Sequence, residues 1–245
     1  MLDLFSGIGG FSIGLEKAGF KTVAFCEIDK KARAVLKKHW PDVQIFEDVS
    51  QLTKEKLDEH GISVDVICGG FPCQDISVAG KGAGLEGQRS GLWYEYHRLI
   101  KEITPQWVII ENVSALRSRG LDAVLRSLFE IGYDAEWHCI PASAVGAPHQ
   151  RDRIWIVAYA NNGGLQGITF ARDVESERKK QQEQLERLHA SQRELAVPSR
   201  SGRGVHDGIP GRVDRLKQLG NAVVPQIPEL IGKAIMSVQK EIHNG

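Results

Sequence analysis

Two short motifs place a thiol and a carboxyl group where they could act on the same molecule. Cys73 lies in GGFPCQ (69–74), directly after a strand predicted over Val64–Cys68, and Glu111 directly follows a buried strand predicted over Trp107–Ile110. Parallel strands end at one edge of a sheet, and such sheets bind ligands there, so we expect the two groups to lie close together. A thiolate that adds to an electron-poor ring suits a carboxylic acid that protonates a ring nitrogen.

The surroundings of Cys73 favour a reactive residue over the alternative, a small buried core cysteine. Pro72 stiffens the approach to the thiol. The glycine-rich segment that follows indicates a mobile loop that could close over a substrate. Further along, Arg151 and Arg153 of HQRDR (149–153) alternate onto one face of a predicted strand. The alternative for these two residues is a pair of ordinary surface arginines.

A glycine-rich turn near the start of the chain predicts a nucleoside-type ligand. DLFSGIGG (3–10) follows a predicted strand and precedes a predicted helix, and Glu27 ends the next strand, where an acid can hold ribose hydroxyls. A dinucleotide fingerprint needs a third glycine at the position of Ser12, which argues against a pyrophosphate cofactor. The alternative is a structural turn followed by a surface glutamate.

The elements that must position these residues alternate along the chain, which predicts an α/β fold with a doubly wound, mostly parallel sheet. Two later strands, Ala135–Ile140 and Ile154–Tyr159, are expected to form a terminal antiparallel hairpin, and Pro228–Ile242 a closing helix. The remaining strands are predicted over Met1–Phe5, Thr22–Cys26, Val43–Phe46, Val64–Cys68 and Trp107–Ile110, and the helices over Phe11–Ala18, Asp29–His39, Trp93–Glu102 and Leu121–Ile131.

Composition and charge set outer limits. The apolar fraction is 42%, the charged fraction 25% and the formal net charge zero, so overall charge gives no argument for nucleic-acid binding. Four cysteines without a CxxC pair, no apolar run of membrane length and no signal-peptide pattern indicate a reduced, cytoplasmic protein without a membrane segment. A polar insert, 160–211, is predicted to interrupt one α/β domain formed by 1–159 and 212–245; the alternative is a disordered excursion.

The motifs together resemble the DNA (cytosine-5)-methyltransferase family. DLFSGIGG, FCEID, GGFPCQ, ENV, QRDR and QLGNAVVP (218–225) occur in the family's order, and the resemblance covers 1 to about 158 and 212–242. It implies a sheet of the S-adenosylmethionine-dependent methyltransferase type, with 1–159 as the catalytic and cofactor-binding domain and 160–211 as a short target-recognition insert. The segment 212–245 would return to the catalytic domain. Because the insert is short and its middle resembles a charged helix, sequence specificity stays open.

The resemblance also assigns roles to residues. Cys73 would attack C6 of a flipped-out cytosine in duplex DNA, Glu111 would contact N3 and the exocyclic amine, and Arg153 would support the flipped base with Arg151 alongside. Nine residues would bind S-adenosylmethionine, which becomes S-adenosylhomocysteine: Phe5, Gly7, Gly9, Glu27, Ile28, Asp48, Val49, Asn221 and Ala222. Three would belong to the active-site loop that contacts DNA: Pro72, Gln74 and Ser77.

Several expectations about the cellular setting follow from the resemblance. The chain would act as a monomer on double-stranded DNA in a bacterial or phage-infected cell, without a metal, and with a restriction endonuclease as a functional partner. A tRNA-directed cytosine-5 methyltransferase would share Cys73, Glu111 and Arg153 and stays an alternative. A cofactor-binding regulator without turnover is another. A nicotinamide oxidoreductase is disfavoured by Ser12 and by the pairing of a thiol with a carboxyl group.

Overall fold

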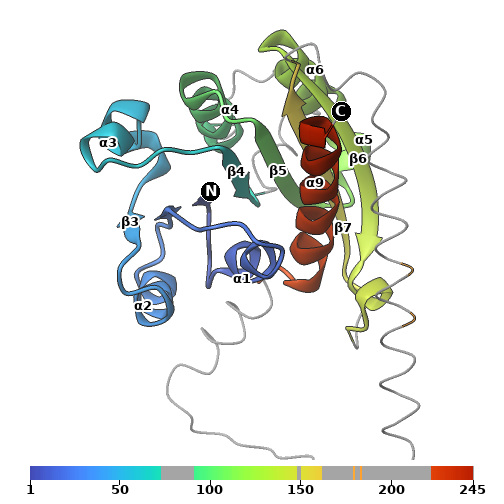
Figure 1. Ribbon diagram of the computed structural model, residues 1–245, viewed down its shortest axis with the longest axis horizontal. Helices are drawn as coiled ribbons and strands as arrows, with labels where there is room; N and C mark the ends of the chain where they lie inside the picture. Colours follow the sequence, from blue (N-terminus) through green and yellow to red (C-terminus); the bar gives the residue numbers. More distant parts are fainter. Residues whose placement is uncertain (73–90, 148–149, 162–178, 180–182, 184–221, 245) are drawn as a thin grey trace, which may run out of the picture.

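The computed structural model, drawn in Figure 1, describes residues 1–72, 91–147, 150–161, 179, 183 and 222–244, with side chains up to residue 240. These residues form a seven-stranded sheet in the order β3-β2-β1-β4-β5-β7-β6. The strands β3, β2, β1, β4 and β5 are parallel to one another, and β7 runs antiparallel to both β5 and β6. The strands are β1 Leu2–Leu4, β2 Ala24–Cys26, β3 Gln44–Phe46, β4 Val66–Gly69, β5 Trp107–Val113, β6 Tyr133–Pro141 and β7 Asp152–Ala160.

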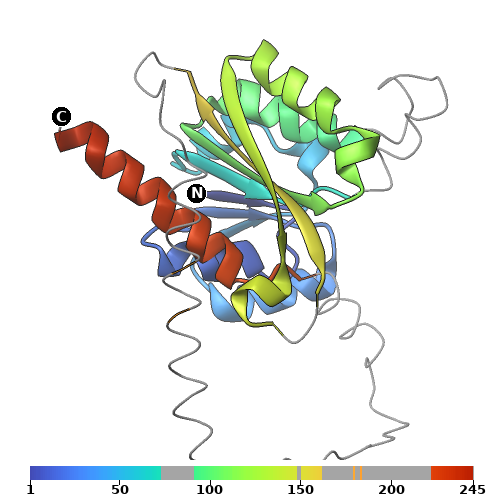
Figure 2. The ribbon, with the colours of Figure 1, turned by 90° about the vertical axis from the view of Figure 1, so that its right-hand side faces the viewer.

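Helices cover both faces of this sheet, which confirms the predicted doubly wound α/β class. In Figure 2 the sheet lies between α4 and α6 on one side and α1, α2 and α9 on the other. The helices are α1 Gly10–Lys17, α2 Lys30–His39, α3 Lys54–Glu59, α4 Gly91–Ile103, α5 Leu116–Arg119, α6 Leu121–Glu130 and α9 Gln226–Asn244, with short 3-10 turns η1 Val49–Gln51 and η4 Ala142–Val145. Among the residues the structure describes, no helix is both long and apolar enough to span a membrane.

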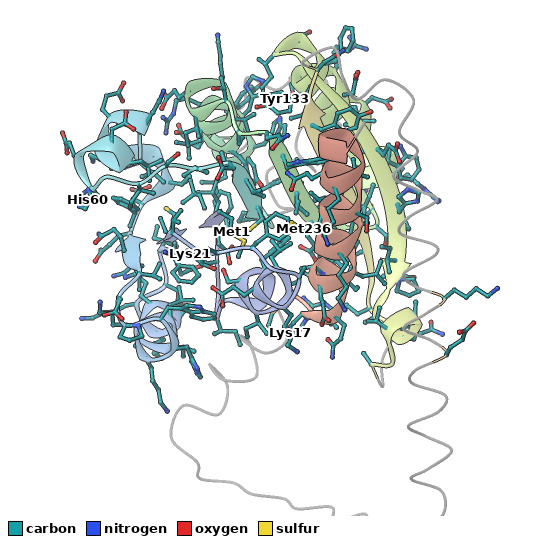
Figure 3. The ribbon with its side chains drawn as sticks, in the orientation of Figure 1. Met1, Lys17, Lys21, His60, Tyr133 and Met236 are labelled. Atoms are coloured by element: carbon teal, nitrogen blue, oxygen red, sulfur yellow. The ribbon has the colours of Figure 1, made fainter. Side chains whose placement is uncertain are left out.

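Two apolar layers hold the helices against the sheet. One layer joins the strands to α3, α4 and α6, with Trp93 and Leu128 at its centre. The other joins them to α1 and α9 and includes Met1, whose ammonium group donates to the carbonyl of Lys21 at 2.6 Å (Figure 3). Because both faces are covered, the central parallel strands β1, β2 and β4 are buried along their whole length and mostly apolar rather than alternating, with Asp3 on β1 as an exception.

The two helices that follow the first strands begin at different kinds of cap. Asp29 caps α2 as predicted, because its carboxylate accepts from the backbone N–H groups of Lys31 and Ala32. The cap position of α1 is Gly9, which has no side chain to offer. The buried carboxyl group of Asp3 on β1 instead accepts a hydrogen bond of 2.8 Å from the Ser12 hydroxyl. This hydrogen bond joins β1 to the first turn of α1 across the glycine-rich turn.

Two elements extend beyond their predicted bounds for clear reasons. The strand expected to end at Ile110 continues to Val113, because Glu111–Val113 pair with the antiparallel β7 after the last pairing with β4, Gly69 with Ile110. Helix α9 begins at Gln226, before the predicted Pro228, because proline is tolerated in the first turn of a helix. Of the polar insert, the structure describes only residues 160, 161, 179 and 183.

Candidate active site

The carboxyl ends of the parallel strands bring most of the predicted site residues to one edge of the sheet. The order of the parallel strands reverses between β1 and β4, which are neighbours in the sheet although two strands separate them in sequence. Open α/β sheets bind ligands outside the strand ends at such a switch point. The glycine-rich turn follows β1, and the approach to Cys73 follows β4, so the two predicted half-sites lie side by side at this point.

The turn after β1 has the backbone of a ligand-binding loop. Phe5 has φ of 52° and Gly7 of 54°, and this left-handed region is costly for a bulky residue such as Phe5. A Cβ atom placed on Gly7 would have no neighbour within 4 Å, so this face of the turn is open. The Phe5 ring stacks on Tyr96 of α4 with ring centroids 6.2 Å apart. Gly9, by contrast, faces Trp40, to which an added Cβ would come within 2.6 Å.

The carboxylate of Glu27 is fixed beside this turn. Its Oε2 accepts from the Gly7 N–H at 2.7 Å, and its Oε1 accepts from the Asp29 N–H at 2.7 Å. The residue is 9% exposed, whereas its neighbour Ile28 is 76% exposed, an unusual state for a large apolar side chain. A preorganised carboxylate next to an exposed apolar surface suits a nucleoside. The carboxylate can accept hydrogen bonds from the sugar hydroxyls, and the apolar surface can pack against the base.

The next predicted cofactor residues follow β3. Asp48 is exposed and caps η1, accepting from the N–H of Ser50 at 2.9 Å and from its hydroxyl at 2.8 Å. These hydrogen bonds lower the pKa of the Asp48 carboxyl. The Val49 side chain is buried in the core, so only its backbone can meet a ligand.

Ala222, near the C-terminal end of the chain, lies next to the start of α1. The residue after it, Val223, packs against Gly10, because a Cβ atom on Gly10 would come within 2.6 Å of the Val223 carbonyl oxygen.

Glu111 and the two arginines meet at the other half of the site. The Arg153 Nε lies 2.8 Å from Oε1 of Glu111, and both side chains stand on the same face of the β5–β7 pair. Burial raises the pKa of the Glu111 carboxyl, although Arg153 and Arg151 oppose the rise. Arg151 precedes β7, and burial together with Arg153 lowers the pKa of its guanidinium. The predicted grouping of these three residues therefore exists in the folded chain.

The segment that leads to Cys73 is held against Glu111. A Cβ atom on Gly70 would lie 2.7 Å from Oε2 of Glu111, so a larger residue at this position would force the Glu111 carboxyl group to shift. The next residue, Phe71, is buried, and its carbonyl accepts a hydrogen bond of 2.9 Å from Nδ2 of Asn112. Pro72 is exposed and is the last described residue of this segment.

Four predicted site residues fall outside the described part of the chain: Cys73, Gln74, Ser77 and Asn221. Their roles stay predictions from the sequence. Two of them nevertheless adjoin described residues, because Cys73 follows Pro72 and Asn221 precedes Ala222.

Several residues that support the site were not singled out from the sequence. Asn112 belongs to the ENV motif but received no role, and the GG pair at 69–70 gave the only signal for Gly70. The structure adds Tyr96 and Arg98 of α4, which contact the turn after β1 and the turn η1. No local motif identifies these two residues, because their contacts depend on how α4 packs against the strand ends.

Comparisons with known proteins identify a family and several relatives. The family described as "C-5 cytosine-specific DNA methylase" matches residues 1–202. The Type II methyltransferase M2.BsuMI of Bacillus subtilis is 36% identical over 166 residues, 64% of this chain and 41% of the relative. M.CviJI of Paramecium bursaria Chlorella virus IL3A is 40% identical over 159 residues, 64% of this chain and 42% of the relative. The chain therefore spans about two-fifths of the length of these two curated relatives.

Among solved structures, a putative DNA modification methyltransferase encoded within an Escherichia coli prophage aligns with a TM-score of 0.56 and 29% identity. The alignment covers 65% of this chain and 46% of that one.

Proposed function

This chain belongs to the C-5 cytosine-specific DNA methylase family, and we propose on that basis that it transfers a methyl group from S-adenosylmethionine to C5 of a cytosine in duplex DNA. The observation that carries the proposal is the contact between Gly70 and Glu111. It brings the segment leading to Cys73 against a partly buried carboxyl group that pairs with an arginine.

The residues around the turn after β1 suit the methyl donor. The two carboxylate oxygens of Glu27, fixed by backbone hydrogen bonds, can accept from ribose hydroxyls. The exposed side chain of Ile28 can pack against the adenine, and the backbone at Gly7 is not covered by other residues. Phe5 and the start of η1 would border the adenine, and Ala222 with Asn221 would close the site. When bound, S-adenosylmethionine supplies an electrophilic methyl group on a sulfonium sulfur.

Cys73 would begin the reaction as a thiolate that adds to C6 of the cytosine. The electron pair moves toward C5, which becomes nucleophilic, and the ring nitrogen N3 takes up a proton as charge develops there. Loss of the C5 proton to a base after methylation would then expel the thiolate, and return of the N3 proton to Glu111 would restore the ring. The base must leave the duplex stack first, at a cost of about a few kcal/mol.

Glu111 is suited to the N3 position. Burial raises its pKa, so the carboxyl group holds a proton more readily than an exposed glutamate does. Arg153 would orient the carboxyl group through the 2.8 Å contact and, with Arg151, stabilise negative charge on the base. Asn112 would act as a positioning residue, because its hydrogen bond to the Phe71 carbonyl fixes the segment that ends at Cys73.

Domain roles and partners form part of the same proposal. Residues 1–159 with 212–245 would make the catalytic domain, and 160–211 a short target-recognition insert acting on duplex DNA. The protein would act as a monomer in the cytoplasm of a bacterial or phage-infected cell. A cognate restriction endonuclease would be its functional partner.

The test is methyl transfer to two substrates in parallel. The purified chain is given tritiated S-adenosylmethionine with duplex DNA of mixed sequence or with unmodified tRNA, and DNA from expressing cells is sequenced after bisulfite treatment. The proposal expects label in DNA and protected cytosines in a short recurring context. Label in tRNA alone would replace DNA by RNA as the substrate, and cofactor binding without transfer to either would indicate a regulator without turnover.

A further inference from the structure

Helix α4 supports the adenine side of the proposed cofactor site through one arginine. The Arg98 Nη2 donates to the carbonyl of Val49 at 3.1 Å and to the carbonyl of Leu52 at 2.8 Å. These carbonyls stand at the first residue of η1 and directly after its last residue. One guanidinium therefore holds both ends of the turn that Asp48 begins.

The guanidinium is itself held by two acids of the same helix. Its Nε donates to Oε2 of Glu95 at 2.8 Å, and its Nη1 donates to Oε1 of Glu102 at 2.7 Å. With four acceptors on three nitrogens, Arg98 has little freedom to rotate, and its planar fork is well suited to this task. The Arg98 side chain is 30% exposed, so the pairs are partly shielded from solvent.

The turn η1 depends on this external support. It comprises three residues, and its own backbone bonds are those of Gln51 N–H to Asp48 at 3.1 Å and of Leu52 N–H to Val49 at 3.3 Å. Such short 3-10 turns have poor hydrogen-bond geometry and little stability of their own. Since the Val49 side chain is buried and its carbonyl is occupied by Arg98, its N–H is the part that can meet a ligand.

The same helix also supports the other border of the proposed adenine site. Tyr96 stacks on Phe5, and its hydroxyl donates to the carbonyl of Ile109 at 3.2 Å, which fixes the ring. Phe5 and η1, which follow different strands, are thus both set by α4.

We propose that Arg98 is a positioning residue for the methyl donor: by holding the carbonyls of Val49 and Leu52, it fixes η1 so that Asp48 and the Val49 N–H meet the adenine edge. This inference rests on the proposed function of the site. It assigns Arg98 to donor affinity and not to the chemical step, because its partners among the described residues are Glu95, Glu102 and the carbonyls at the two ends of η1, none of which takes part in the proposed reaction.

Calorimetric titration of the full chain with S-adenosylhomocysteine, without DNA, tests the proposal. Arg98→Met removes both carbonyl contacts and should raise the dissociation constant about tenfold, as expected for lost hydrogen bonds to a charged group. In Arg98→Gln the side chain is too short to reach both carbonyls, so the dissociation constant should rise here as well. Glu95→Gln is the matched control, since it removes the charge that pairs with Nε and Nη2 of the same guanidinium but leaves the Val49 and Leu52 carbonyls as acceptors for Nη2.

The result expected is weaker binding in both Arg98 variants with near-normal binding in the Glu95→Gln variant. Circular dichroism melting shows whether each variant is folded, and Arg98→Gln carries the test if Arg98→Met does not fold. In single turnovers at saturating donor, the Arg98 variants should keep the wild-type rate while KM for the donor rises.

Wild-type affinity in a folded Arg98 variant, or an equal loss of affinity in the Glu95→Gln variant, would overturn the role of Arg98. A wild-type chain that binds S-adenosylhomocysteine but methylates no DNA would instead refute the proposed function. The titration result for Arg98 would still stand in that case.

Discussion

Gly70 lies against the carboxyl group of Glu111, so that a Cβ atom at position 70 would stand 2.7 Å from Oε2. The other carboxylate oxygen, Oε1, is held by Arg153 at 2.8 Å, which limits how far Glu111 can retreat. The segment that follows β4 therefore packs against β5 at the place where the proposed nucleophile and the proposed acid must act together.

Gly70→Ala should therefore slow catalysis by displacing Glu111. We expect a single-turnover methylation rate at least about tenfold lower, together with a stability loss of about 1–3 kcal/mol from overpacking. Rapid-quench assays and chemical denaturation measure the two effects. Gly91→Ala is the control, because an added Cβ there has no neighbour within 4 Å. A wild-type rate in the Gly70→Ala variant would show that this contact does not set the position of Glu111.

Glu111→Gln removes the acid but keeps the shape of the side chain. The loss of general acid catalysis should lower the single-turnover rate by about 10²- to 10⁴-fold. DNA affinity, measured by fluorescence anisotropy, should change little, since the amide can still hydrogen-bond the base. Glu59→Gln alters an exposed carboxylate on α3 and serves as the control. Equal rates in the two variants would remove Glu111 from proton transfer.

Cys73→Ala should abolish methylation and leave S-adenosylhomocysteine binding near its wild-type value, because a nucleophile lost from the chemistry need not alter the cofactor site. Duplex DNA containing 5-fluorocytosine should form a covalent adduct with the wild-type chain and none with this variant, as denaturing gels would reveal. Cys139→Ala removes an exposed free thiol on β6 and should behave as wild type. Adduct formation by the Cys73→Ala variant would assign the nucleophile elsewhere.

Asp3→Asn should change how stability depends on pH. Burial raises the pKa of the Asp3 carboxyl to about 8, although hydrogen bonds from Ser12 oppose the rise, whereas its ordinary value is 3.8. Between about pH 4 and pH 8 the folded chain keeps a proton that the unfolded chain has lost, so stability falls as pH rises through this window. Above about pH 8 this contribution levels off.

The asparagine variant cannot ionise and should lack this loss, so its stability relative to the wild type should improve from pH 5 to pH 8. Guanidinium denaturation at several pH values measures the difference, with the exposed Asp58→Asn as a control. Parallel pH profiles for the Asp3→Asn variant and the wild type would contradict a protonated Asp3.

Gly14→Ala should loosen the junction between α1 and α9. An added Cβ would collide with the carbonyl of Pro225 and come within 2.9 Å of the Glu229 nitrogen. We expect a loss of about 1–3 kcal/mol in the free energy of unfolding. Weaker S-adenosylhomocysteine binding should follow, because Ala222 lies just before this junction. Thermal denaturation and calorimetry test both effects, and an unchanged melting temperature would mean that α9 moves aside without cost.

Much of the fold follows from local patterns in the sequence. The runs that became β1, β2, β4 and β5 are short, mostly apolar and stand between helical patterns, so their alternation predicts a parallel sheet. Asp29 marks the start of α2 because capping is a local interaction. The prediction failed at the end of β5, since only the pairing of Glu111–Val113 with β7 shows that the strand continues.

The amino-acid sequence already points to the thiol of Cys73 and the carboxyl of Glu111 as the reactive groups, and to the glycine-rich turn with Glu27 as the cofactor site. Residue type and motif order carry that information without coordinates. Tertiary structure alone decided how they are supported, through Gly70 against Glu111, Asn112 on the Phe71 carbonyl and Arg98 under η1. The physical reason is that hydrogen bonds and close packing between distant segments depend on distances of a few tenths of an ångström, which are fixed only when both sheet faces are packed.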